Sequence, residues 1–394
     1  MTDAQLLPLD DLCDLAVASI DPHRNPEHAF WYVDISAVDN VTKLIATPRK
    51  VVGKLASVRA RQVIRTNDVL VATTRPNLNA VALVPGQYDG AICSTGFCVL
   101  RAGEQIDPDY LFLFSRSLQF IEPLTDLTKG ALYPAVTDRQ VFAQKLPWVP
   151  VEYQRQIAAR LKAQLAEVET AQQAAQAQLS DSRLLRSRML KEFFAELDAV
   201  PKKKLGEYAK TTSGSTPSRG NKLYWQQAEI AWVKTGEVAF APITVTEESI
   251  SRTALVECSL SLLPPKTILI AMIGQGKTRG QSAILEISAT TNQNCFAVLP
   301  NDTWEPDFLY LWMKSSYQDL RELSADRGGS QAALNGALMN ALDVPAPSKA
   351  EQQHIVTRIQ AAMTEIDALE NSSKAVLEDI HRLPSRVLAQ AFGQ

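Results

Sequence analysis

The chain has 394 residues, of which 46% are hydrophobic and 21% are charged, and its formal net charge is −3. This length exceeds what one core normally organises, so about two to four domains are expected. No apolar run is long enough to span a membrane and no signal peptide is recognisable, which predicts a cytoplasmic protein. The five cysteines are scattered without a Cys-x-x-Cys pair, which disfavours a metal site or a disulfide framework.

The slightly acidic balance argues only mildly against nucleic acid as a partner, because binding depends on local basic patches. Residues 1–146 carry short apolar runs rich in β-branched residues, such as 69–71 and 80–84, separated by Gly, Pro and Asn. This pattern predicts a mixed but β-leaning domain. Within it, residues 107–120 are predicted to form a helix, with Asp107 as its cap and Pro108 in its first turn.

A long helix is predicted inside residues 147–200. No proline or glycine occurs between Glu152 and Glu196, and good helix formers dominate. Apolar positions step by four and three in turn from Leu161 to Leu179, which is typical of a coiled-coil seam, here diluted by polar and small residues. Such a helix would be about 65 Å long and would need a second helix packed against it.

The second half of the chain follows the same plan. Residues 201–345 repeat the style of the first domain, and residues 346–394 contain a second long helical pattern. That pattern runs from Glu351 to near Leu383, and Pro384 is predicted to start or kink a short final helix. The two long helices are predicted to pair antiparallel, through Leu161, Leu165, Val168, Leu179, Ile359, Met363, Ile366 and Leu377.

An internal repeat relates the two halves at an offset of roughly 200 residues. The segment PDYLFLF at 108–114 returns as PDFLYLW at 306–312, and Gln154 returns as Gln352. The sequence therefore predicts an α+β fold with two similar β-leaning domains separated by two long antiparallel helices. The loops differ far more than the framework, as at 75–79 against 274–279, which indicates one scaffold that reads two different targets.

No catalytic motif is convincing. Residues 271–278 fit a relaxed phosphate-loop pattern, but the following residues 279–287 indicate a turn into another strand instead of a helix. We therefore expect this loop to offer Lys277 and backbone N–H groups to a phosphodiester or a base edge. The chain is predicted to perform no chemistry itself, although an ATP-dependent enzyme using Lys277 is a third interpretation.

Polar and basic loop residues form the candidate recognition surface, since amides suit adenine and arginines suit guanine. Any one of them is as well suited to forming a turn as to contacting DNA. The predicted DNA-binding residues are Thr74, Arg75, Asn77, Ser94, Thr95 and Lys129 in the first copy, and Ser215, Thr216, Arg219, Lys234, Thr235, Gln275, Lys277, Thr278, Arg279, Asn292 and Gln293 in the second.

Four motifs of the second copy carry a family resemblance: GSTPS at 214–218, WVKTG at 232–236, IGQGK at 273–277 and NQN at 292–294. With the helical regions behind each domain, the whole chain resembles the specificity subunit of a type I restriction-modification system. The first copy diverges, because it lacks the Ser-Thr-Pro segment and the glycine-rich loop.

The resemblance implies two target-recognition domains, residues 1–146 and 201–345, separated by helical spacer regions at 147–200 and 346–394. Each domain would read one half of a split target in double-stranded DNA. The implied partners are two methyltransferase subunits and a restriction or translocase subunit, which would bind S-adenosylmethionine, ATP and magnesium, while this chain would hold no cofactor or metal. The alternative is a coiled-coil adaptor that binds proteins through its two domains.

Overall fold

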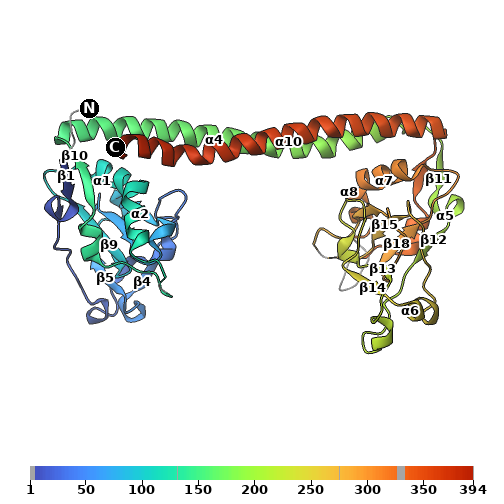
Figure 1. Cartoon of the computed structure of the whole chain (residues 1–394), viewed down its shortest axis with the longest axis horizontal. Helices are drawn as coiled ribbons and strands as arrows, with labels where there is room; N and C mark the ends of the chain where they lie inside the picture. Colours follow the sequence, from blue (N-terminus) through green and yellow to red (C-terminus); the bar gives the residue numbers. More distant parts are fainter. Residues whose placement is uncertain (1–4, 131, 275, 326–332, 394) are drawn as a thin grey trace. The chain divides into compact units, whose positions relative to one another are not determined.

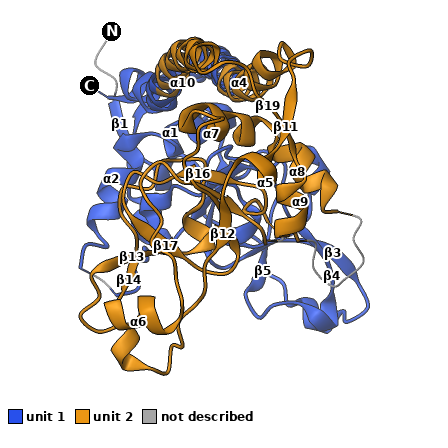
Figure 2. Ribbon diagram, turned by 90° about the vertical axis from the view of Figure 1, so that its right-hand side faces the viewer, with its two compact units in different colours: residues 1–176, 375–394 blue, residues 177–374 orange. Residues whose placement is uncertain are grey.

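The computed structural model describes residues 5–130, 132–274, 276–325 and 333–393. The chain divides into two compact units, unit 1 (Met1–Gln176 with Ala375–Gln394) and unit 2 (Ala177–Lys374), coloured separately in Figure 2. Each unit combines a sheet-rich globular part with segments of both long helices. The four-segment division predicted from the sequence stays a prediction. No helix among the described residues is both long and apolar enough to cross a membrane.

Unit 1 contains two four-stranded sheets. The first, in the order β2-β9-β6-β7, is antiparallel throughout and is formed by β2 (Cys13–Asp14), β9 (Phe97–Ala102), β6 (Val69–Ala72) and β7 (Val81–Leu83). The second, in the order β4-β3-β8-β5, is formed by β4 (Arg49–Val52), β3 (Ala29–Val33), β8 (Ile92–Ser94) and β5 (Ala60–Val63), and its β3–β8 pair is parallel. A separate antiparallel pair joins β1 (Gln5–Pro8) to β10 (Lys145–Trp148).

Unit 2 repeats this strand order, except that its second sheet has three strands where that of unit 1 has four. Figure 1 labels strands of both sheet-rich parts. Its antiparallel sheet consists of β12 (Thr211–Ser213), β18 (Cys295–Val298), β15 (Ile268–Ala271) and β16 (Ser282–Ile284). Its second sheet consists of β14 (Glu248–Ile250), β13 (Ile230–Val233) and β17 (Ala289–Thr291), with β13–β17 parallel. The closing pair is β11 (Lys202–Lys204) with β19 (Asp343–Pro345). The predicted α+β fold with an internal repeat is therefore confirmed.

The helix predicted over 107–120 is instead two helices, α1 (Pro108–Ser115) and α2 (Leu118–Asp126). Asp107 caps α1 as predicted, because its side chain accepts hydrogen bonds from two backbone N–H groups. The break follows from Ser117, whose hydroxyl donates to the Phe114 carbonyl at 2.7 Å. A serine bonded back to the preceding turn favours a helix end over its continuation. Unit 2 breaks at the matching place, between α7 (Pro306–Ser315) and α8 (Tyr317–Leu323).

The remaining short α-helices lie in the connections between strands. They are α3 (Asp138–Phe142) in unit 1 and α5 (Leu205–Tyr208), α6 (Arg252–Glu257) and α9 (Gly336–Asn340) in unit 2.

The two long helices are α4 (Val151–Ala195) and α10 (Lys349–Phe392). The prediction that Pro384 begins a separate final helix is wrong, since α10 continues through it. Proline removes one helical hydrogen bond, but the residues beyond it are anchored by packing. Leu388 and Phe392 are both nearly fully buried in the core of unit 1.

Each core takes in the beginning of one long helix and the end of the other. In unit 1, Leu161 of α4 shares a cluster with Leu388 of α10. In unit 2, Leu190 of α4 shares a cluster with Ile355 and Ile359 of α10. Because the start of one helix meets the end of the other in each unit, the helices run antiparallel, as predicted.

Two phenylalanines at equivalent places in the repeat end the long helices inside these cores. The Phe392 ring lies 5.2 Å from that of Tyr110 and 5.5 Å from that of Phe114. The Phe194 ring lies 5.5 Å from that of Phe308. Edge-to-face pairs of this kind add to the burial of large apolar rings. The last residues of α10 thus complete the core of unit 1, and the last residues of α4 complete the core of unit 2.

Of the eight predicted helix-pairing residues, Leu161, Leu179, Ile359 and Ile366 are buried and the other four are partly buried. The seam also holds polar groups. Arg186 of α4 forms an ion pair with Asp367 and another with Glu370 of α10, the latter at 3.2 Å. Charged groups in an apolar seam restrict which helix register is acceptable.

Candidate nucleic-acid interface

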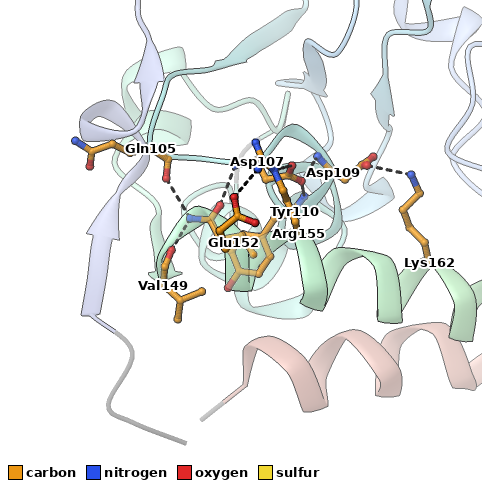
Figure 3. Close-up of polar contacts among 9 residues, drawn as sticks. Gln105, Asp107, Asp109, Tyr110, Val149, Glu152, Arg155 and Lys162 are labelled. Carbon is orange, nitrogen blue, oxygen red and sulfur yellow. Dashed lines mark hydrogen bonds and ion pairs between the residues drawn. The ribbon is translucent and has the colours of Figure 1, made fainter.

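A buried glutamine joins the start of α4 to the loop before α1. Figure 3 labels its three partner residues, Gln105, Asp107 and Val149. Gln154 is fully buried. Its Oε1 accepts from the Asp107 N–H at 2.8 Å, and its Nε2 donates to the carbonyls of Gln105 at 3.1 Å and Val149 at 2.6 Å. All three partners are backbone groups, so the side chain holds two chain segments together without dependence on neighbouring side chains.

The same clamp occurs in unit 2. Gln352, also fully buried, accepts from the Glu305 N–H at 2.7 Å and donates to the carbonyls of Thr303 at 2.9 Å and Pro347 at 2.8 Å. The sequence repeat pointed to Gln154 and Gln352, but their role was missed because it depends on loop carbonyls that no motif identifies. Each globular part is fixed to its own long helix in the same way.

Outer contacts strengthen the junction in unit 1. Lys162 of α4 forms an ion pair with Asp109 of α1 at 3.0 Å, and the Tyr110 hydroxyl donates to the Pro147 carbonyl at 2.7 Å (Figure 3 draws the lysine pair). The ion pair is exposed and contributes little to stability by itself. Together these contacts fix the direction in which α4 leaves the globular part.

In unit 1, backbone hydrogen bonds bring two predicted contact segments together with residues 135–136. The Thr73 N–H donates to the Gly96 carbonyl at 2.9 Å, and the Val136 N–H donates to the Thr73 carbonyl at 2.9 Å. Thr74 and Ala135 form an isolated β-bridge. The loop at 73–79, the turn at 94–96 and residues 135–136 therefore lie side by side.

The predicted DNA-binding residues of unit 1 differ in exposure and in whether their side chains already have partners. Arg75 and Asn77 are exposed, and Arg75 has a left-handed φ of 50°. Lys129 is exposed but forms an ion pair with Asp126 at 2.8 Å. Ser94 is 3% exposed, and its hydroxyl accepts from the Gly96 N–H at 3.1 Å, which favours a turn-forming role over a DNA contact. Thr74 and Thr95 are exposed on the same surface.

Unit 2 brings its predicted segments together around β17. The Ser215 N–H donates to the Thr291 carbonyl at 3.0 Å, and Gly214 approaches that carbonyl so closely that a Cβ would lie 1.7 Å from the oxygen. This explains the glycine of the GSTPS motif. The Thr216 hydroxyl donates to Gln293 Oε1 at 2.6 Å.

Two further predicted residues complete this surface from neighbouring segments. The Thr235 hydroxyl donates to Asn292 Oδ1 at 2.9 Å. Asn292 Oδ1 also accepts from the Asn294 N–H at 3.0 Å. Asn292 is therefore engaged in holding two loops together, whereas Gln293 is exposed beside them.

Two predicted cations of unit 2 are held by carboxylates. Glu248 forms ion pairs with Arg219 at 2.5 Å and with Lys234 at 3.2 Å, and Lys234 also pairs with Glu247. These partners hold the pKa of Glu248 below its usual range, with the Arg219 hydrogen bond as the main favourable cause. Arg219 also lies 3.8 Å from the Trp225 ring centroid, a cation–π contact. The sequence did not reveal this cluster, because its members come from separate segments.

The loop between β15 and β16 carries the remaining predicted residues. Lys277 and Thr278 are on it, and the Tyr317 hydroxyl donates to the Lys277 carbonyl at 2.7 Å. Arg279 is only 8% exposed, so its side chain belongs to the interior of the loop. Gln275 lies outside the described residues. Because the loop joins two antiparallel strands, it opens no helix that could hold a nucleotide phosphate.

The described residues include no group of three or more His, Cys, Asp or Glu side chains placed to hold a metal ion. Burial raises the pKa of the Cys13 and Cys295 thiols to about 12. Thiols of this kind are packing residues, because the thiolate is the nucleophilic form. The arrangement thus offers hydrogen-bond donors, acceptors and cations for recognition, on loops held by a rigid framework.

Comparison with known proteins agrees with this arrangement. Residues 198–379 match the type I restriction modification DNA specificity domain. The chain is 28% identical over 171 residues to the EcoR124I/EcoR124II specificity subunit of Escherichia coli, covering 43% of this chain and 41% of that one. It is 30% identical over 196 residues to the MjaIX specificity subunit of Methanocaldococcus jannaschii, covering 47% and 43%. The matched segments thus span less than half of these relatives.

Solved structures extend the likeness to nearly the whole chain. A chain from a study of complex assembly and conformational transition of the type I R-M system superimposes with a TM-score of 0.78 at 29% identity, covering 98% of this chain and 97% of that one. The HsdS subunit of Thermoanaerobacter tengcongensis superimposes with a TM-score of 0.65 at 28% identity, covering 98% and 96%.

Residues 198–379 thus match a type I DNA specificity domain, and the fold of the whole chain is similar to that of a solved HsdS subunit. The chain is therefore similar to type I restriction-modification specificity subunits, in agreement with the resemblance read from its motifs.

Proposed function

We propose that this chain is the non-catalytic DNA-reading subunit of a type I restriction-modification complex, and that each globular part reads one half of a split target. The observation that carries this proposal is the repeated topology with dissimilar polar loops. Similar frameworks would place two recognition surfaces in the same way relative to their helices. Different loops, such as 73–79 and 272–281, then suit different base sequences.

The helices would serve as spacer and as docking surface for two methyltransferase subunits, with a restriction or translocase subunit joining them. Equal clamps at Gln154 and Gln352 and equal core phenylalanines support this, because they present two helical surfaces of the same design. S-adenosylmethionine, ATP and magnesium would be bound by those partners. Methylation and cleavage would also be theirs.

A domain exchange tests the reading role. Replacing residues 1–146 by the corresponding domain of a related subunit should change one half of the methylated target and leave the other half as it was. Methylation by the assembled complex, mapped on a DNA library, is the measurement. A change in both halves would contradict separate reading.

Lengthening the helices tests the spacer role. Inserting seven residues into both 163–178 and 361–376 preserves the apolar repeat while adding about 10 Å of helix. The preferred gap between the half-sites should lengthen while the half-sites stay the same. An unchanged gap would refute the spacer role. Absence of salt-sensitive DNA binding, even with the methyltransferase present, would favour the protein-adaptor alternative.

A further inference from the structure

In unit 1 two basic side chains lie close together. Lys43 Nζ donates to the Asn79 carbonyl, and Asn79 Nδ2 donates to the Arg116 carbonyl at 3.1 Å, so the three residues form one linked group. Within the described ranges, neither Lys43 nor Arg116 forms an ion pair. Arg116 Nε and Asn79 Oδ1 are buried and have no hydrogen-bond partner.

The surroundings of these cations disfavour positive charge. Burial is the main cause, and the charge of Arg116 a second one, that lowers the pKa of Lys43 to about 8, while Asp39 opposes the shift. Burial also lowers the pKa of Arg116. An unpaired buried donor and two uncompensated cations are costly in a folded protein. An anion held between them would remove both penalties.

Unit 2 shows that the fold does not require this arrangement. Lys314 stands at the same distance from Pro306 as Arg116 does from Pro108. Beside Lys314, however, lies the aromatic Phe240, whose φ of 59° matches the 62° of Lys43. Lys314 Nζ is 5.7 Å from the Phe240 ring centroid; burial and the charge of Arg186 lower the pKa of Lys314, while Asp367 opposes the shift. Unit 2 therefore has an aromatic side chain beside its cation, where unit 1 has a second cation.

The cation group also adjoins the predicted DNA-contact loop. Asn79 is the C-cap of the short 3-10 helix Pro76–Leu78, and Arg75 is its N-cap. Both caps have left-handed backbones, with φ of 50° at Arg75 and 48° at Asn79. Leu44 and Leu78, next in sequence to Lys43 and Asn79, are 62% and 46% exposed. The group is therefore at the surface and next to the exposed Arg75.

We propose that Lys43 and Arg116 form a pocket for one phosphodiester group of the DNA backbone, with Asn79 positioning both. This rests on the proposed function, since it requires that unit 1 faces DNA. A guanidinium offers a planar set of donors to phosphate oxygens, and an ammonium adds a point charge. A phosphate contact of this kind sets the register of unit 1 on the duplex and carries no base preference.

The test uses the full chain and a random-sequence duplex, with binding measured over a range of KCl concentrations. Lys43→Met and Arg116→Met should each reduce the slope of log K against log salt by about 1, because one phosphate contact is lost. The double variant should lose no more than either single one, since both side chains hold the same phosphate. Lys54→Met is the matched control, because Lys54 is in the same unit and pairs with Glu27.

Stability separates this role from a structural one. Lys43→Met removes an uncompensated cation and should raise the melting temperature while it weakens DNA binding. Variants that bind the duplex with an unchanged salt slope would overturn the pocket. Stabilisation by inorganic phosphate that Arg116→Met abolishes, with the slope unchanged, would assign the pocket to free phosphate and also overturn the proposal. A wild-type chain without salt-dependent binding, even when assembled with methyltransferase, would overturn the proposed function itself.

Discussion

Units 1 and 2 share one topology but hold their surface charges differently. In unit 2, Arg219 and Lys234 pair with carboxylates of the same unit. In unit 1, neither Lys43 nor Arg116 forms an ion pair among the described residues; Lys43 donates to a backbone carbonyl and Arg116 lies over the Phe112 ring. A duplicated framework thus preserves strand order and helix attachment, while the electrostatics of its loops diverge. Under the proposed function, the shared framework would position the two units and the differing loops would recognise DNA.

The largest effect is expected from removing the phenylalanine that the end of each long helix contributes to a core. The comparison tests whether the two cores depend on these rings equally. Phe392→Ala and Phe194→Ala should each cost about 3–5 kcal/mol, because a buried ring is replaced by a cavity. Urea unfolding of the full chain, followed by a probe in each unit, is the measurement. Each variant should destabilise mainly the unit that holds its ring. Gln360→Ala, at an exposed position, serves as the control. An equal loss of unfolding free energy in that variant would contradict the role of the phenylalanine rings.

The glutamine clamps should have the next largest effect, and an equal one in the two units. Gln154→Leu and Gln352→Leu each leave a partly buried backbone N–H and at least one carbonyl without their partner, which costs about 1–3 kcal/mol for an unsatisfied group. The Gln105 carbonyl keeps the Trp148 indole N–H as a donor at 3.1 Å. Gln353→Leu changes the exposed neighbour in the same helix and should stay within about 0.5 kcal/mol of the wild type. Unfolding free energies decide the matter. If the losses of unfolding free energy in Gln154→Leu and Gln352→Leu differ by more than the smaller of the two losses, the junctions are not equivalent.

The helix seam of unit 2 should show a smaller effect. Arg186→Met removes the ion pairs to Asp367 and Glu370. Glu370 is then left partly buried with only the more distant Lys374, at 4.0 Å, as a cation partner, so we expect a loss of about 1–2 kcal/mol. Restoring an apolar seam with Glu370→Leu in the same chain should recover stability. A double variant less stable than Arg186→Met alone would argue against this account.

The smallest effect concerns the pH dependence of unit 1. The folded pKa of Lys43, about 8, lies below its ordinary value of 10.5. Between these values the unfolded chain binds more protons, so stability should rise with pH across that range. Asp39 and Arg116 are the charged groups that face Lys43. The gain should be at most about 1 kcal/mol, because solvent screens a half-buried group, and it should be absent from Lys43→Met.

Much of the architecture was predictable from the sequence, because its signals are local or periodic. The lack of proline and glycine between Glu152 and Glu196 predicted α4 to within a residue or so at either end. The repeat predicted two similar domains. The separate final helix predicted from Pro384 does not form, because packing of Leu388 and Phe392 outweighs one lost helical hydrogen bond.

The candidate site was less accessible from the sequence. Arg219, Lys234 and Glu248 come together from three segments, and Lys43 meets Arg116 from 73 residues away in the sequence. No local pattern contains such pairs. The role of the predicted DNA-binding residues stays a prediction, although their placement on shared loop surfaces is compatible with it.

The placement of Phe392 has a consequence for synthesis of the protein. Unit 2 is one continuous stretch, Ala177–Lys374, whereas unit 1 is assembled from Met1–Gln176 and Ala375–Gln394. Domains generally fold as the chain leaves the ribosome. Unit 2 can therefore complete its core first, while unit 1, although translated earlier, must wait for Leu388 and Phe392. A chain terminated before these residues would leave the apolar socket around Tyr110 and Phe114 uncovered, which marks incomplete products for proteolysis.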